Sequence, residues 1–389
     1  MHHRFSLLAG ALLLLILLTV SGSAMAELAR IVTPGGPVKM RKKPSSKASV
    51  VVQVPNNSFV ELDEAGEEWC HVTYKGRSGY IMTDYVITAA SQADSPLALS
   101  YAPQTPSVGC RMDFTAVCEG AVAYRYTLAI GSGKAITSEK VPYDSVSFRP
   151  RQSGISCLEV TAWYADGSEI TNQLYFEIAP EDVSCQTESI ADTFVVFSQK
   201  DGWWQDKKYR SSDLDTSGCA IFTLAHALQH MGFTTSADRP EELAVRYAFC
   251  LVDGGTLNST LIGRSAKNYG FSTKADLISS EREIVSRLEG GAMFTFAIVR
   301  GHIALIDGLS EDGTKVRIVD SAPSVTLERI SGGSMYIPAA DGAWQTVTAI
   351  SEIPGARYYF ETDQFGGLTY YLDLKYVARR GVRLIQPAH

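Results

Sequence analysis

The spacing of the apolar residues changes along this chain, and that change constrains which folds it can form. From residue 29 to about residue 180, apolar and polar residues mostly alternate in short runs between glycine, proline and asparagine, a pattern typical of short antiparallel strands. From about residue 193 the spacing becomes three and four, as in amphipathic helices, before strand patterns return near residue 293. We therefore expect a multidomain chain with all-β segments first and an α+β segment last.

The first 26 residues have the pattern of a secretory signal peptide. Arg4 precedes an apolar run from Leu7 to Val20, and the small residues Ala24 and Ala26 favour cleavage after Ala26. The apolar run is shorter than the roughly 20 residues that cross a bilayer. We therefore predict a mature chain without a transmembrane span that is secreted or associated with the cell envelope. An uncleaved N-terminal anchor is the alternative.

Two all-β segments are expected before residue 180. Residues 29–90 contain alternating runs such as SFVEL and WCHVTY between the turn sequences PGG, PNN and YKGRSG, which predict a small β-barrel. Residues 88–107 are rich in Ala, Ser and Pro and favour a linker. Residues 108–180 contain further alternating runs, such as AYRYTLAI and SCLEVTAWY, which predict a β-sandwich.

Residues 193–389 are expected to form an α+β domain. SGCAIFTLAHALQHMGF places its apolar residues at the spacing of a helix that ends at Gly232. Further helices are predicted in PEELAVRYAFCLV, NSTLIGRSAKNYG and EREIVSRLEGG. Strands are predicted in MFTFAIV, HIALIDGL, TKVRIVDS, ARYYFET and LTYYLDL. Helices followed by antiparallel strands are typical of α+β architecture.

Charge and cysteine content argue against some classes of function. The net charge of −7 argues against nucleic-acid binding, and KMRKK at residues 39–43 is the one dense basic stretch. Seven cysteines is an odd number, so at least one is expected to stay unpaired in an exported chain. Cys110, Cys118, Cys157 and Cys185 could form two disulfides. The cysteines and histidines lack zinc-like spacing, so we expect no metal and no cofactor.

Cys219 is the strongest candidate for a catalytic group. It follows a glycine and opens the first predicted helix, where unpaired backbone N–H groups and the helix dipole stabilise a thiolate. The thiolate is the form of cysteine that attacks carbonyl groups. Two structural alternatives remain from position alone: a small buried apolar residue, or one half of a disulfide with Cys250.

His302 and Asp320 are the candidates for the base that a cysteine nucleophile needs. His302 begins one predicted strand and Asp320 ends the next. If the hairpin folds about Glu311, His302 faces Asp320, and the carboxylate can orient the imidazole. In that register one face is formed by Ala304, Ile306, Val316 and Ile318, with 304 opposite 318 and 306 opposite 316. Asp320 capping the turn at DSAP is the structural alternative.

Other polar residues in this segment have structural interpretations. Asp307 and Arg317 alternate onto the opposite face of the hairpin and predict an ordinary ion pair. His226 and His230 are four residues apart on the first helix, a spacing that suits a metal, but a third ligand is missing. Both lie two turns or more beyond Cys219, too far to act as its base. We therefore assign neither histidine a catalytic role.

The segment VVFSQKDGWWQDKKYRSSDLDTSGCAIFTLAHALQHMGF, followed by GHIALIDGL and VRIVDSAP, resembles the papain-like bacteriocin-processing peptidases, cysteine peptidase family thirty-nine. The exported, stand-alone members are the most similar. The resemblance implies that Cys219 is the nucleophile and that Gln199 donates to the oxyanion. It likewise implies that His302 is the base and Asp320 the orienting carboxylate. The chain departs from the family at Ala220, where glycine or a small polar residue is common, and after Asp320, where proline commonly follows directly.

The donors of the oxyanion hole are less well defined by the sequence. The side-chain amide of Gln199 and the Cys219 N–H would form such a hole, and Gln205 is the competing candidate. Trp203 and Trp204 could line the cleft, with burial in the core as the alternative for at least one of them.

Residues 29–90 resemble the bacterial Src-homology-3-like domain of exported cell-wall proteins, through VKMRKKPSSKASVV, EEWCHVTY and GRSGYI. The resemblance implies binding of wall peptides or other ligands, with a spacer barrel that binds nothing as the alternative. GISCLEVTAWYADGSE, within residues 108–180, resembles the late hairpin of an immunoglobulin-like domain. That resemblance implies a role in spacing or in contact with a partner.

Together these observations predict an exported cysteine peptidase that hydrolyses a peptide or protein substrate and is targeted by its barrel, for example to a cell-wall ligand. A peptidoglycan amidase or endopeptidase of the NlpC or CHAP type is the nearest alternative. The sequences DCSG and PGDL, usual in NlpC-type enzymes, do not occur here. A non-catalytic wall-binding protein is the other alternative. Residues 330–389 have no predicted role.

Overall fold

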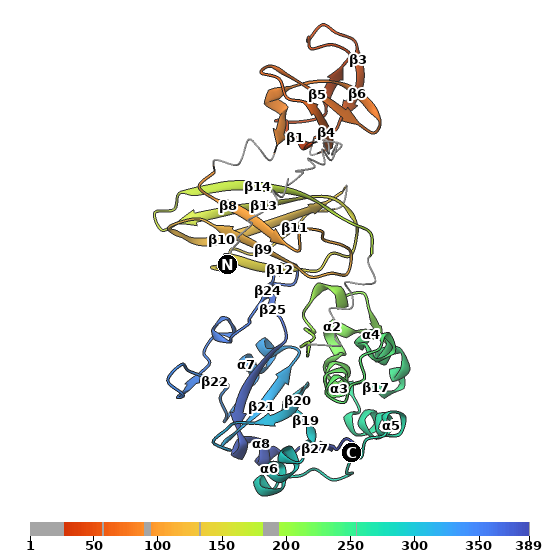
Figure 1. The fold of residues 1–389 in the computed structure, drawn as a ribbon, viewed down its shortest axis with the longest axis vertical. Coiled ribbons are helices and arrows are strands. Elements are labelled where there is room, and N and C mark those ends of the chain that lie inside the picture. The colour runs from red at the N-terminus through yellow and green to blue at the C-terminus, as the bar shows by residue number, and fades with distance from the viewer. Residues whose placement is uncertain are drawn as a thin grey trace, which may run out of the picture. The chain divides into compact units, whose positions relative to one another are not determined.

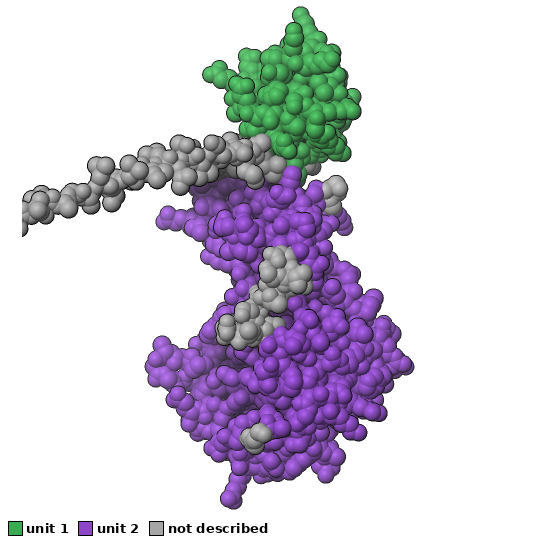
Figure 2. Space-filling model, turned by 45° about the vertical axis from the view of Figure 1, so that its right-hand side comes forward, with its two compact units in different colours: residues 1–88 green, residues 89–389 purple. Residues whose placement is uncertain are grey.

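The computed structural model forms two compact units, residues 1–88 and 89–389 (Figures 1 and 2). The structure describes residues 27–56, 58–88, 95–131, 134–181, 194–253 and 255–388. The predicted signal peptide therefore lies outside the described residues. None of the described helices is both long and apolar enough to cross a membrane.

The first unit is a small antiparallel β-barrel. Its strands are β1 (Glu27–Ile31), β2 (Val38–Arg41), β3 (Val50–Val54), β4 (Phe59–Glu64), β5 (Trp69–Tyr74), β6 (Arg77–Met82) and β7 (Val86–Thr88). They form one sheet in the order β3-β2-β6-β5-β4-β1-β7, and alternate side chains such as Met40, Val72 and Ile81 fill its core. The predicted turn after β5 has positive φ at Lys75 and Gly76, as a two-residue hairpin turn requires.

The second unit begins with two β-sheets packed around one core. In chain order, their strands are β8 (Ala98–Ala102), β9 (Met112–Val117), β10 (Ala121–Ile130), β11 (Ile136–Thr137), β12 (Ser145–Phe148), β13 (Gly154–Tyr164) and β14 (Glu169–Ile178). One sheet contains β8, β9 and β12, and the other contains β10, β11, β13 and β14. Phe114 and Phe148 of one sheet and Leu158 and Phe176 of the other share this core. The predicted linker at residues 88–107 is wrong in part, because β8 pairs with β9 along its whole length.

A segment near the C-terminus returns to this sandwich. Strands β24 (Tyr358–Tyr359) and β25 (Gln364–Phe365) join β12, β9 and β8 to complete a five-stranded sheet. Tyr359 pairs with Ser147 of β12 (Figure 1). Phe360 is buried in the sandwich core. The sequence predicted a strand here within the α+β sheet, and that placement is wrong. The boundary predicted between residues 180 and 193 remains a prediction, since residues 89–389 cluster as one unit.

Four of the helices described in residues 194–388 lie where the apolar spacing predicted them: α3 (Cys219–His230), α4 (Pro240–Arg246), α5 (Asn258–Tyr269) and α6 (Glu281–Glu289). The helices α2 (Leu214–Ser217), α7 (Pro323–Arg329) and α8 (Leu374–Arg380) were not predicted, and α8 begins at the last residue of the run LTYYLDL, for which a strand was predicted. The second predicted helix ends early, because a 3₁₀ turn at Ala248–Cys250 leads into the short hairpin β17 (Leu251–Val252) and β18 (Gly255–Thr256). Gly270 ends α5 in the left-handed conformation.

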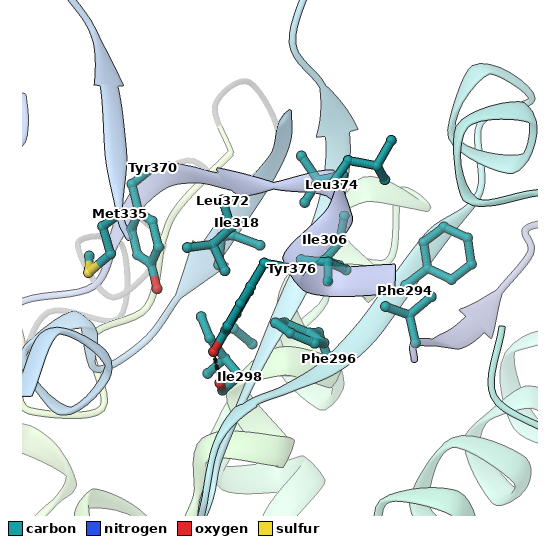
Figure 3. Close-up of a cluster of buried hydrophobic side chains, with 14 of the residues drawn as sticks. Phe294, Phe296, Ile298, Ile306, Ile318, Met335, Tyr370, Leu372, Leu374 and Tyr376 are labelled. Atoms are coloured by element: carbon teal, nitrogen blue, oxygen red, sulfur yellow. Dashed lines mark hydrogen bonds between the residues drawn. The ribbon is translucent and has the colours of Figure 1, made fainter. Parts of the chain in front are cut away.

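These helices pack on a seven-stranded antiparallel sheet. In spatial order its strands are β23 (Trp344–Thr346), β22 (Tyr336–Pro338), β26 (Leu368–Asp373), β21 (Lys315–Asp320), β20 (His302–Leu309), β19 (Met293–Val299) and β27 (Arg383–Ile385). One face packs a core that includes Phe294, Phe296 and Tyr370 (Figure 3). Leu305 and Val319 alternate to the other face and pack against α3.

The hairpin register predicted from a turn about Glu311 is wrong. Leu305 pairs with Val319 and Ile306 with Ile318, and the pairing then shifts between Ile306 and Gly308. An extra residue in one strand is a bulge, which alternation alone does not locate. Before the bulge, the predicted register differs from the observed one by two residues. An even shift leaves each side chain on its predicted face, so the predicted apolar face is correct. Ala304, Ile306, Val316 and Ile318 are all fully buried.

The cysteine prediction also needs correction. Cys118 is a free thiol, so the two disulfides predicted in this region do not both form. Cys110 is disulfide-bonded, and Cys185 lies outside the described residues. Cys219 and Cys250 are both free, which removes the disulfide alternative for Cys219.

Candidate active site

Cys219 is the first residue of α3 and is partly exposed. The short helix α2 ends at Gly218, whose N–H donates to the Leu214 carbonyl. A Cβ on Gly218 would lie 2.4 Å from that carbonyl oxygen and 2.8 Å from the Phe222 ring, so only glycine fits this junction. The first N–H groups of a helix have no intrahelical acceptor. The Cys219 thiol therefore lies at the positive end of α3.

The start of α3 is fixed against β20. Every residue from Ala220 to Leu228 is buried, which anchors the helix along its length. The Thr223 hydroxyl donates to the Cys219 carbonyl at 2.8 Å and approaches the Ile303 carbonyl at 3.1 Å. Ile303 follows His302, so this contact links the helix start to the strand that carries the histidine.

His302 lies between Cys219 and Asp320. Its Nε2 is 2.6 Å from Asp320 Oδ1, and its ring also hydrogen-bonds the Cys219 thiol. The histidine is 3% exposed and the aspartate fully buried. Burial alone lowers the pKa of His302, but the Asp320 charge and the hydrogen bonds to Asp320 and Cys219 raise it to about 10. The site thus favours the protonated, imidazolium form of His302.

Asp320 contacts His302 and also caps the turn at DSAP through the Ala322 N–H, the contact given as its structural alternative, and it accepts two hydroxyl bonds that the sequence did not predict. Besides His302, its carboxylate accepts bonds from the Ala322 N–H (2.8 Å), the Thr326 hydroxyl (2.6 Å) and the Tyr370 hydroxyl (2.7 Å). Burial alone raises the pKa of Asp320, but the His302 charge and these hydrogen bonds outweigh it and lower the pKa. The carboxylate therefore stays ionised in a fully buried position.

Gln199 lies beside the end of β21. Its backbone N–H donates to the Ser321 carbonyl at 2.8 Å, and its side-chain Nε2 donates to the Asp215 carbonyl at 3.0 Å. The Ser321 hydroxyl approaches its Oε1 at 3.5 Å. These contacts orient the amide with Nε2 toward the residues preceding Cys219. The amide nitrogen carries two N–H donors, so one is left to donate after the bond to the Asp215 carbonyl.

Two side chains of α3 hold the segment that leads to Gln199. His226 Nε2 accepts the Phe197 N–H at 2.9 Å, and the Gln229 amide bonds both the N–H and the carbonyl of Val195. Burial of His226 lowers its pKa to about 3, so the ring is neutral and accepts this bond. His226 thus has a positioning role, which its spacing from Cys219 did not indicate.

The other predicted polar residues lie away from the thiol. His230 Nε2 is 2.7 Å from Asp307 Oδ2, and Arg317 forms two bonds to the same carboxylate, which confirms the predicted Asp307–Arg317 pair. His226 and His230 therefore contact different partners. Across the described ranges, no three His, Cys, Asp or Glu side chains are grouped so that they could hold a metal ion.

Gln205 and the two tryptophans belong to a different region. Gln205 follows the 3₁₀ turn Gly202–Trp204, and its N–H donates to the Gly202 carbonyl. Trp204 is buried, with its ring edge-on to Phe222. Both tryptophans line a small cavity of about 50 Å³, separate from the cleft at Cys219.

A cleft of about 610 Å³ opens beside Cys219 and His302. Its hydroxyl-bearing lining residues are Ser211, Ser212, Thr216, Ser217 and Thr256. Its apolar lining residues are Leu251, Val252, Ala297, Val299 and Ile303. Asp253, near the tip of the β17–β18 hairpin, adds a carboxylate. The cleft thus presents hydroxyl groups, apolar side chains and one carboxylate to a bound chain.

Comparison with known proteins identifies the first unit. Residues 36–87 match the family model described as Bacterial SH3 domain, in agreement with the barrel resemblance. The match covers this segment alone. No curated protein sequence matches the chain. The chain therefore contains an N-terminal bacterial SH3 domain, followed by β-rich regions with several helices.

Solved structures give only distant likenesses. NlpC2 from Trichomonas vaginalis is 10% identical over 88% of this chain and 97% of its own, with a TM-score of 0.17. NlpC1 from the same organism is 11% identical over 91% of this chain and 96% of its own, with a TM-score of 0.18. The PKD1 domain of the Vibrio cholerae metalloprotease PrtV is 13% identical over 21% of this chain and 94% of its own, with a TM-score of 0.16. TM-scores this low do not establish a shared fold.

Proposed function

We propose that this protein is an extracytoplasmic cysteine hydrolase that cleaves peptide or amide bonds with Cys219, His302 and Asp320. The observation that carries the proposal is the chain of contacts from the thiol at a helix N-terminus, through a buried histidine, to a carboxylate with four donors. Such a chain combines an activated nucleophile, a base and an orienting group. The papain-like fold and the resemblance to cysteine peptidase family thirty-nine belong to this proposal.

The mechanism follows from these contacts. The Cys219 thiolate attacks the carbonyl carbon, so an S–C bond forms and the C=O π electrons move to oxygen. The tetrahedral intermediate collapses, the C–N bond breaks, and the His302 imidazolium gives its proton to the leaving amine. Water then attacks the thioester while His302 takes its proton, and the acid product leaves with Cys219 regenerated. Asp320 stays ionised throughout and holds the imidazole in place.

The oxyanion in this mechanism has two proposed donors, the Cys219 N–H and the Gln199 side-chain amide. Gln199 is favoured over Gln205 because its Nε2 lies 3.0 Å from the carbonyl of Asp215, four residues before Cys219. Because Ser321 and Asp215 orient the amide, it would need little reorganisation when the oxyanion forms.

The barrel supplies the second part of the proposal. A depression of about 300 Å³ on this unit is lined by Trp69 and Tyr85 together with Lys39 and Arg41. Aromatic rings with nearby cations are suited to a peptide that offers apolar and carboxylate groups. We assign this surface to a cell-wall peptide, with a spacer role as the alternative.

A peptidoglycan amidase or endopeptidase is the second candidate. The bacterial SH3 domain at residues 36–87 favours it, because such modules are typical of extracytoplasmic proteins that contact the cell wall. It uses the same residues and the same steps, so it differs from the first candidate in substrate alone. A non-catalytic wall-binding protein is the remaining alternative.

The test is hydrolysis by the purified mature chain of both peptide libraries and intact peptidoglycan, followed by mass spectrometry. We expect release of new amino termini, abolished in Cys219→Ala and in His302→Ala and reduced but measurable in Asp320→Ala. Cys250→Ala, which removes a buried thiol outside this chain of contacts, is the matched control and should retain activity. Wild-type activity in Cys219→Ala would refute the proposal.

A further inference from the structure

Asp253 is the one carboxylate among the described residues that line the cleft beside Cys219 and His302. The other ionisable groups of that lining are Cys219 and His302 themselves, and His302 is already paired with Asp320. Asp253 is exposed, and within the described ranges no Lys, Arg or His side chain forms an ion pair with it. The cleft therefore holds a carboxylate with which a bound molecule can pair.

The hairpin that leads to Asp253 is fixed to the rest of the cleft. Leu251 pairs with Thr256 across β17 and β18, and the Thr256 hydroxyl donates to the buried Tyr209 hydroxyl at 3.1 Å. The Arg210 guanidinium donates to the Leu251 carbonyl, so this cation contacts the hairpin backbone and forms no ion pair with Asp253. The hairpin therefore has a defined position two residues before the carboxylate.

Apolar side chains line the same cleft as this carboxylate. Leu251 and Val252 directly precede Asp253, and Val299 of β19 and Ile303 of β20 also line the cleft. Val252 is 39% exposed, so its side chain is open to a bound molecule. A group with an aliphatic stem and a charged end can contact apolar surface along its stem while its end pairs with an opposite charge. The cleft wall suits a cationic group of that kind.

We propose that Asp253 forms a specificity subsite that binds an ammonium or guanidinium group of the substrate. This inference rests on the proposed function, and it names the substrate as a peptide with a cationic group close to the cleaved bond. The apolar wall favours a lysine or arginine side chain over a free amino terminus as the source of that group. Asp253 lies outside the chain of contacts from Cys219 to Asp320, so we expect it to select substrates and to leave the chemical steps unchanged.

The first test measures modification of Cys219 in the full mature chain by two methanethiosulfonates, one with a trimethylammonium group and one with a sulfonate. The ratio of their rates at Cys219, divided by the same ratio for free cysteine, measures the local preference for a cation. We expect this ratio to fall about two- to fivefold in Asp253→Asn, the range for an exposed ion pair. It should fall further in Asp253→Lys, which reverses the charge. The fraction of thiolate affects both reagents equally, so it cancels from the ratio.

The matched control is Asp276→Asn, which removes an exposed carboxylate that does not line the cleft and should leave the ratio unchanged. In the wild type the preference should weaken as the ionic strength rises, because salt screens exposed charges. Equal ratios in the wild type, Asp253→Asn and Asp253→Lys, with Cys219 still modified rapidly, would overturn the cation subsite and leave the proposed hydrolase intact. Slow modification by both reagents in the wild type would instead contradict the proposed function.

The second test identifies the source of the cation, with peptide libraries whose amino termini are either free or acetylated. We expect cleaved peptides to be enriched in lysine or arginine near the cut in both libraries. Asp253→Asn should abolish this enrichment and raise KM for such peptides, with kcat largely unchanged. A preference that disappears on acetylation would support the subsite and assign the cation to the amino terminus. Cleavage by the wild type without preference for any cationic group would overturn the subsite, although the hydrolase itself would stand.

Discussion

Tyr370→Phe should destabilise the protein in a way that depends on pH. The variant removes the hydroxyl that donates to Asp320 Oδ2 at 2.7 Å and leaves the apolar ring in the core. A hydrogen bond to a charged group contributes about 1.5–3 kcal/mol, and one between neutral groups about 0.5–1.5 kcal/mol. We therefore expect the free energy of unfolding to fall by about 1.5–3 kcal/mol at pH 7, where Asp320 is ionised.

The sign of the pH dependence follows from the lowered pKa of Asp320. A carboxyl whose pKa is lower in the folded state adds stability above its unfolded pKa, and that contribution is lost as the pH falls through the folded value. Loss of the Tyr370 donor moves the folded pKa of Asp320 upward. The difference between wild type and variant should therefore shrink toward about 0.5–1.5 kcal/mol as the pH falls through the lowered folded pKa of Asp320.

The assay is urea unfolding of both proteins at pH 7 and at stepwise lower pH while they remain folded, with Tyr376→Phe as the matched control. Tyr376 lies in the same core, and its hydroxyl donates to the Ile298 carbonyl at 3.4 Å (Figure 3) and accepts from the Arg380 guanidinium at 2.8 Å. Neither partner changes its charge in this pH range, so the control should show the same loss at every pH. A loss of stability in Tyr370→Phe that does not shrink as the pH falls through the acid range would refute the view that this hydroxyl stabilises an ionised Asp320.

Two further variants test the junction before α3 and a buried carboxyl group. Gly218→Ala places a methyl group 2.4 Å from the Leu214 carbonyl oxygen, so we expect a loss of about 1–3 kcal/mol by thermal unfolding and slower alkylation of Cys219. Gly263→Ala, with open space at the Cβ on α5, should instead be neutral or stabilising. Burial and the nearby Asp201 charge raise the pKa of Glu361 to about 8, so the folded state holds more protons than the unfolded state between about pH 4.3 and 8. The free energy of unfolding of the wild type should therefore fall as the pH rises through that range, and Glu361→Gln should fall less steeply. Chemical denaturation of both proteins across the range is the measurement, and parallel pH profiles would contradict this account.

Local sequence patterns were sufficient to predict the helices and strands in which apolar residues recur at regular spacing. The apolar spacing after Cys219 predicted α3 to within a residue or two, and alternation predicted the strands that carry His302 and Asp320. The contact between these two side chains was reached through a register that is wrong by two residues. Alternation preserves the face of a residue when the error is even, so both side chains lie on the predicted face and still meet although their backbones are not paired.

The rest depends on contacts between residues that are distant in sequence. Tyr370 reaches Asp320 from β26, fifty residues later, and nothing in LTYYLDL marks which tyrosine donates. His226 holds the Phe197 N–H, although its spacing on α3 suggested only an unlikely metal pair. Tyr358 and Tyr359 form a strand of two residues, too short for any period, so their place beside β12 is set by packing alone.

The most direct measurement is the rate of iodoacetamide labelling of the mature protein from pH 6 to pH 8, with sites located by mass spectrometry. An ordinary thiol has a pKa of about 8.5, so its labelling rate should rise about 75-fold over this range. If Cys219 and His302 form a thiolate–imidazolium pair, Cys219 should be labelled rapidly at pH 6, with little increase to pH 8, and His302→Ala should restore the steep dependence. Steep dependence in the wild type, or fast labelling that persists at pH 6 in His302→Ala, would contradict the catalytic role assigned to this pair.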